Sequence, residues 1–200
     1  MKQPKAKPHN RLAGVPDDVV IAPQAEAPRG GKGHDSSKQK SSFRELSWTE
    51  FDGFVQKLAR KIHKQYNPDV VVGVAHGGVF VGGALAAALA LEFYPVRISR
   101  RSRDHQSKTV PKMFGKMPKE LGGRNVLLVD DVAASGETLK LAQSLILKAG
   151  AVRVETACLL RRPSGYAPRF TSIVSSKLHI FPWDYEPVVD GRRFETSRVP

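Results

Sequence analysis

The sequence predicts an α/β fold with a mostly parallel five-stranded sheet flanked by helices. Two features of the chain predict it. Short, nearly continuous apolar runs are typical of strands buried on both faces, and helical segments separate these runs. The chain has 200 residues, 40% of them hydrophobic, which is enough for one domain with a proper core. Because sheets of this kind bind ligands beyond the carboxyl ends of their strands, we look for a site there.

The folded domain is predicted to span residues 47–200, after a disordered basic tail at residues 1–46. The tail is rich in Pro, Gly, Ser and Lys and carries no apolar period. A basic arm that folds on nucleic acid remains an alternative interpretation of this segment. Order begins at Ser47, which forms a capping-box pattern with Glu50. The amphipathic helix that follows has apolar residues at three- and four-residue spacing: Trp48, Phe51, Val55, Leu58, Ile62 and Tyr66.

Strand and helix signals alternate along the rest of the chain. Strands are expected at 69–75, 94–100, 125–131, 152–160 and 170–176, and helices at 77–92 and 136–150. Residues 101–124 are polar, basic and without a period. This alternation is the pattern of a parallel sheet whose two faces are both covered by helices.

Charge and composition limit the class of protein. The net charge is +13, of which the tail contributes +4, so the basic excess also belongs to the domain. Such an excess suits nucleic acid, an acidic surface or a phosphate-rich small molecule. The single cysteine, Cys158, cannot form an internal disulfide, which fits a reducing cytosol. No apolar run is long enough to span a bilayer, so we expect a cytoplasmic protein with no membrane partner.

The segment VLLVDDVAASGETL, residues 126–139, is the most informative motif. Asp130 and Asp131 end a buried strand, small residues follow, and a helix then begins. The free N–H groups of a helix N-terminus bind anions, and paired carboxylates accept bonds from sugar hydroxyls or hold Mg²⁺. The chain has neither GxxxxGK[ST] nor GxGxxG, which argues against a P-loop NTPase and a dinucleotide-binding domain. A receiver-type phospho-acceptor aspartate would need no glycine cradle behind it.

This motif resembles the thirteen-residue phosphoribosyl pyrophosphate (PRPP) motif of the type I phosphoribosyltransferase family. The resemblance covers roughly residues 47–190 in element order. FPWDYEP, residues 181–187, is most similar to the 6-oxopurine branch, the xanthine, guanine and hypoxanthine enzymes. The resemblance implies the family fold with a small C-terminal hood, and a homo-oligomer. It also implies a purine-salvage enzyme that transfers ribose 5-phosphate from PRPP, with Mg²⁺, to a nucleobase, giving a nucleoside monophosphate and pyrophosphate.

The resemblance also implies a role for each position of the motif. Asp130 and Asp131 would bind the ribose hydroxyls, directly or through Mg²⁺. The 5′-phosphate would be held by the loop residues Ala134, Ser135, Gly136, Glu137 and Thr138. GVAHGGVF resembles the family's pyrophosphate loop, in which a cis peptide often occurs, so His76, Gly77 and Gly78 would bind pyrophosphate. Relatives in the oxopurine branch carry Arg or Lys where this chain has His76.

The remaining implied residues lie in the lid and the base pocket. Residues 97–124 correspond to the family's catalytic loop and carry nine Lys or Arg against two acids, so a basic lid would attract and cover PRPP. Its candidate residues are Arg100, Arg101, Arg103 and Lys108. Trp183 is expected as the platform for the base, and Arg161 as the cation near a 6-oxo group. Ala134 departs from the oxopurine branch, which places an Asp there; adenine and orotate relatives also lack that acid.

A second function remains open at this stage. A regulatory protein of the same fold would sense PRPP or a nucleotide and bind nucleic acid through its basic surface. The intact acid pair and the basic lid favour the enzyme, whereas the basic tail, His76 and Ala134 keep the regulatory alternative, with nucleic acid as a partner.

Overall fold

The computed structural model describes residues 43–99 and 110–185. The four predicted lid residues Arg100, Arg101, Arg103 and Lys108 lie outside these ranges, as does all of the predicted tail before Phe43. Within the described ranges, no helix is long and apolar enough to cross a membrane.

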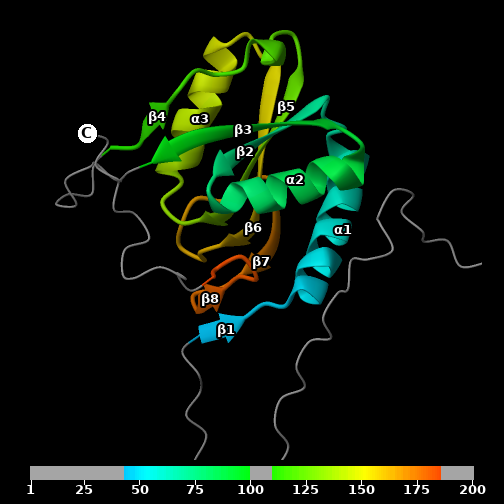
Figure 1. Cartoon of the computed structure of the whole chain (residues 1–200), viewed down its shortest axis with the longest axis vertical. Coiled ribbons are helices and arrows are strands. Elements are labelled where there is room, and N and C mark those ends of the chain that lie inside the picture. The colour runs from blue at the N-terminus through cyan, green and yellow to red at the C-terminus, as the bar shows by residue number, and fades with distance from the viewer. Residues whose placement is uncertain (1–42, 100–109, 186–200) are drawn as a thin grey trace, which may run out of the picture. The chain divides into compact units, whose positions relative to one another are not determined.

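The centre of the fold is a six-stranded sheet with the order β4-β3-β2-β5-β6-β7 (Figure 1). Five strands are parallel, as predicted. The sixth, β4, pairs antiparallel with β3 and lies in the segment for which the sequence showed no period. The strands are β2 (Val70–Ala75), β3 (Glu92–Ser99), β4 (Lys112–Phe114), β5 (Asn125–Ala133), β6 (Arg153–Arg161) and β7 (Phe170–Val174).

Helices cover both faces of this sheet, as the alternating pattern predicted. Helices α1 (Trp48–Gln65) and α2 (Gly77–Leu89) pack on one face, and α3 (Glu137–Lys148) packs on the other, with a short 3-10 turn at Lys119–Leu121. Successive residues along each strand point to opposite faces of the sheet. In β2, Val71 packs with α1 and α2, whereas Val70 and Val72 pack on the side of α3.

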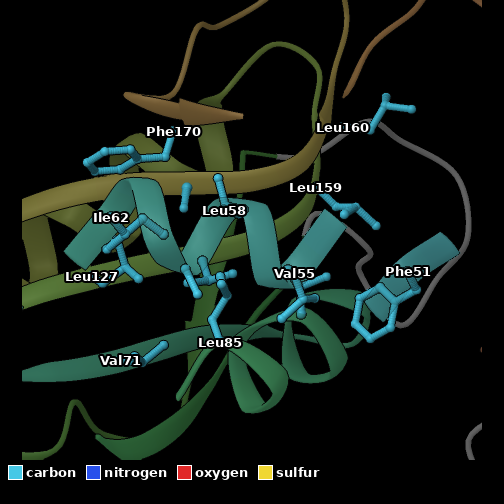
Figure 2. Close-up of a cluster of buried hydrophobic side chains, with 14 of the residues drawn as sticks. Phe51, Val55, Leu58, Ile62, Val71, Leu85, Leu127, Leu159, Leu160 and Phe170 are labelled. Atoms are coloured by element: carbon cyan, nitrogen blue, oxygen red, sulfur yellow. The ribbon is translucent and has the colours of Figure 1, made fainter. Parts of the chain in front are cut away.

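Helix α1 begins at the predicted capping box. The Ser47 hydroxyl accepts a bond from the Glu50 N–H at 3.2 Å, and the Glu50 carboxylate accepts one from the Ser47 N–H at 2.9 Å. Figure 2 shows the apolar stripe of α1 packed with Leu85 of α2 against strand residues that include Val71 and Leu127. The buried residues of the stripe are Phe51, Val55, Leu58, Ala59 and Ile62. This packing turns the opposite, polar side of α1 outward.

A second, two-stranded sheet joins the two ends of the described chain. β1 (Phe43–Glu45) pairs in parallel with β8 (Leu178–Ile180). Leu46 is 4% exposed, and its N–H donates to the Ile180 carbonyl at 2.9 Å. Residues 43–46, which the sequence analysis placed in the tail, therefore pair with β8 and pack against the domain.

Candidate functional site

The candidate site lies at the carboxyl edge of the central strands. β2, β5 and β6 are neighbours, with Gly73 opposite Val129 and Ala133 opposite Arg161. This register brings the loops that follow the three strands to one edge of the sheet. The predicted pyrophosphate and phosphate loops therefore meet in space, although more than 50 residues separate them in the chain.

Asp130 and Asp131 form a partly buried carboxylate pair near the end of β5. The Asp131 N–H donates to Oδ1 of Asp130 at 3.0 Å, and the Val132 N–H donates to Oδ1 of Asp131 at 2.7 Å. Burial and then the charge of Asp131 raise the pKa of Asp130 well above its ordinary value. Burial also raises the pKa of Asp131, against the lowering effect of the Val132 N–H bond. A ligand that donates hydroxyl groups or brings positive charge would stabilise this carboxylate pair.

The loop after β2 lies directly against this pair. A Cβ placed on Gly77 would lie 1.7 Å from Oδ2 of Asp131, and one placed on Gly78 would lie 2.8 Å from the Val129 carbonyl oxygen. Neither distance leaves room for a side chain. The two glycines therefore permit the close approach of the loop to the acid pair. The Ala75–His76 peptide at the start of this loop is cis.

The predicted phosphate loop leads into the N-terminus of α3. Gly136 has φ +76°, a left-handed conformation that favours glycine, and no side chain caps the helix in the described structure. The dipole of α3 favours an anion at this N-terminus. Ala134, Ser135 and Glu137 are exposed at this point.

Residues after β6 fix the conformation of this loop, and the sequence analysis missed them. The Tyr166 N–H donates to the Ala134 carbonyl oxygen at 2.8 Å, and a Cβ on Gly136 would lie 2.3 Å from the Tyr166 side chain. A Cβ on Gly165 would lie 2.1 Å from the same Ala134 oxygen. The Tyr166 hydroxyl also lies 3.3 Å from Oγ1 of Thr156. No local sequence pattern links these positions, since Tyr166 is 30 residues from Gly136.

The predicted base-binding residues occupy other environments than expected. Trp183 is 8% exposed, and the rings of Phe80 and Phe181 lie parallel to it, with centroids 5.1 and 4.9 Å away. In the described structure these two rings cover the indole of Trp183, and its role as a base platform stays a prediction. Nη1 of Arg161 lies 3.3 Å from the carbonyl oxygens of Arg162 and Pro163, so its guanidinium bonds to its own loop.

The acid pair could hold a divalent cation only if a bound ligand supplied further oxygen atoms to the metal. Within residues 43–99 and 110–185, no group of three or more His, Cys, Asp or Glu side chains is placed to hold a metal ion. Mg²⁺ demands six oxygen ligands and commonly takes one or two carboxylates together with substrate phosphates and water. Asp130 and Asp131 match that partial set.

Comparison with known proteins now identifies the class. The sequence model of the family described as "Phosphoribosyl transferase domain" matches residues 47–190, so the chain belongs to this family. The matched range contains the acid pair and both loops described above.

Two kinds of relative agree with this assignment. An adenine phosphoribosyltransferase of Pelodictyon phaeoclathratiforme is 35% identical over 102 residues, which cover 48% of this chain and 58% of that protein. The match thus spans little more than half the length of this curated relative. A purine phosphoribosyltransferase structure from Pyrococcus horikoshii Ot3 superposes with a TM-score of 0.65 at 27% identity, covering 75% of this chain and 99% of that chain. A xanthine-guanine-hypoxanthine enzyme from Helicobacter pylori shares the fold with a TM-score of 0.60 at 18% identity, covering 71% of this chain and 93% of that chain.

Proposed function

We propose that this protein transfers the ribose 5-phosphate group of PRPP to a purine base, giving a nucleoside monophosphate and pyrophosphate. The observation that carries the proposal is the partly buried pair Asp130–Asp131, which lies against Gly77 and is followed by the loop that leads into the N-terminus of α3. One edge of the sheet thus offers carboxylate acceptors for sugar hydroxyls and N–H donors for phosphate. PRPP is a ligand that uses both.

The chain's own residues would act mainly by positioning. The ribose hydroxyls would donate to Asp130 and Asp131, and the N–H groups at the start of α3 would hold the 5′-phosphate. The loop His76–Gly78, against the acid pair, would take the pyrophosphate. Mg²⁺, when bound, would neutralise charge on the leaving pyrophosphate. Holding sugar and base in line needs no side-chain nucleophile, and such positioning is worth several orders of magnitude in rate.

The choice of purine is the finer part of the proposal. The sequence analysis predicted a 6-oxopurine from Trp183 and Arg161. Burial of Trp183 and the bonds of Arg161 to its own loop weaken that prediction. Ala134 stands where the oxopurine branch carries an acid, and curated relatives at 34–37% identity are named adenine phosphoribosyltransferases. These observations favour adenine over guanine, hypoxanthine and xanthine.

The test is pyrophosphate release from PRPP and Mg²⁺ with each purine and with orotate in turn. We expect release with at least one purine, fastest with adenine. The Asp130→Asn/Asp131→Asn variant should lose release. The control, Asp52→Asn, changes an exposed carboxylate on α1 and should keep it. Fastest release with a 6-oxopurine would restore the first prediction of the base. Binding of PRPP without release from any base would contradict the enzyme and favour the regulatory protein that senses PRPP.

A further inference from the structure

The outward side of α1 carries a row of cations. Lys57, Arg60, Lys61 and Lys64 are exposed and follow one another at spacings of three, one and three residues, so they share one side of the helix. This side is nearly opposite the stripe that packs into the core. The row is about 10 Å long, at 1.5 Å per residue. Residues 53–65 of α1 contain no Asp or Glu.

Two further arginines lie at the C-terminal end of α1, beside Gln65 and Tyr66. Nη2 of Arg169 donates to the Gln65 carbonyl oxygen at 3.2 Å, and the guanidinium of Arg153 lies 5.3 Å from the centroid of the Tyr66 ring. Both arginines pair with the same carboxylate, Glu155, at 2.6 and 2.7 Å. One acid therefore neutralises only one of two cations. We call the row Lys57, Arg60, Lys61 and Lys64 the α1 basic face, and the two arginines lie beyond its C-terminal end.

The cations of the row itself have no acidic partner in the described structure. None of the ion pairs formed between described residues involves Lys57, Arg60, Lys61 or Lys64. Their charges are therefore available to a ligand in solution.

The C-terminal end of α1, where the basic face ends, lies at the edge of the sheet away from the candidate PRPP site. The Tyr66 hydroxyl donates to the carbonyl oxygens of Val126 and Arg153, at the amino ends of β5 and β6. The acid pair and the phosphate loop lie toward the carboxyl ends of these strands. β6 alone, from Arg153 to Arg161, spans about 26 Å at 3.3 Å per residue. Substrate phosphates therefore do not account for these charges.

We propose that the α1 basic face binds the phosphodiester backbone of a nucleic acid, without reading its sequence. A row of flexible lysines with no acid among them matches a repeating anion. Protein interfaces, by contrast, are depleted of lysine and use apolar anchors at their centre. A membrane surface would need the apolar side of α1, and that side is buried in the core. The row is long enough to reach about four phosphates of one strand, which are about 3.4 Å apart along the helix axis.

The test is fluorescence anisotropy of the full chain with a mixed-sequence duplex DNA and a single-stranded RNA, between 50 and 200 mM salt. Contact by four cations predicts a plot of log affinity against log salt with a slope of about −3.6 on the duplex. Lys57→Gln/Lys61→Gln should reduce that slope by about 1.8 and weaken binding about tenfold or more at 100 mM salt. Glutamine has a helix propensity close to that of lysine, so the fold should persist.

The matched control removes the same charge elsewhere. Lys119→Gln/Lys148→Gln alters two exposed lysines near the amino edge of the sheet on the side of α3, and should leave the slope nearly unchanged. Melting temperature and PRPP binding should match wild type in both variants. Equal weakening by both variants, or no binding to either nucleic acid, would overturn the proposal. The proposal would also be overturned if the chain bound phosphatidylserine vesicles or polyglutamate more tightly than nucleic acid and Lys57→Gln/Lys61→Gln weakened that binding. The partner would then be a membrane surface or an acidic protein.

Discussion

Gly77→Ala tests whether the loop after β2 and the acid pair form one site. The added methyl would lie 1.7 Å from Oδ2 and 2.2 Å from Cγ of Asp131, about half an ordinary contact distance. Asp131 or the loop must therefore move. Overpacking of this kind costs about 1–3 kcal/mol. Because the displaced group is the proposed ribose ligand, we expect affinity for Mg²⁺–PRPP to fall at least about tenfold, or about 1.4 kcal/mol.

The control for this change is on the same helix. Gly83 also lies within α2, but a Cβ placed there would meet no atom within 4 Å. Gly83→Ala should stabilise the fold by about 0.5–1 kcal/mol through helix propensity alone and leave PRPP affinity unchanged. Thermal unfolding and titration calorimetry measure the two effects. If Gly77→Ala behaved like Gly83→Ala in both measurements, the close contact between the loop and Asp131 would not be part of the binding site.

The acid pair, the phosphate loop and the first strand can each be tested by stability measurements. Asp130→Asn should stabilise the ligand-free protein at neutral pH, by about 1.4 kcal/mol for each unit by which folding raises the pKa of Asp130. Because the pKa of Asp130 is raised in the folded state, the wild type loses stability as pH rises through that pKa. The stability gained by Asp130→Asn should therefore vanish below about pH 4, where the wild-type carboxyl is protonated in both states, and thermal melts across pH measure this. A gain that stays constant with pH would contradict the raised pKa as its cause. Gly136→Ala should lower the melting temperature by several degrees, because φ is +76° and the methyl would meet Tyr166 at 2.3 Å; an unchanged melt would refute the loop geometry. A chain beginning at Phe43 should melt like the full chain, whereas one beginning at Ser47 should lose about 2 kcal/mol with buried Leu46; equal melts would show that β1 adds nothing.

Local patterns in the sequence were enough to predict most of the fold. The capping box at Ser47 and Glu50 and the apolar spacing of α1 are short-range signals, and both were confirmed. The buried strands were recognisable because their apolar runs are nearly continuous. Their parallel pairing follows the rule that strands separated by helices form a parallel sheet covered on both faces. The meeting of the two loops at one edge followed from that topology.

Other features depend on contacts that no short segment encodes. β1 and β8 are three residues each, too short to show a period, and they pair across more than 130 residues. The bond of Tyr166 to Ala134 likewise depends on the packing of the loop after β6. Trp183 shows that one residue type can fit two roles. An aromatic side chain serves equally as a base platform or as core, and only the positions of Phe80 and Phe181 distinguish the two.

Calorimetric titration of the full chain with PRPP in the presence of Mg²⁺ tests the central claim most directly. The claim is that Asp130 and Asp131 at the end of β5 bind the ribose of PRPP. Wild type and Asp52→Asn should bind with equal affinity, and Asp130→Asn/Asp131→Asn should show no measurable heat while its circular dichroism spectrum stays unchanged. Retained PRPP affinity in the double variant would contradict the account.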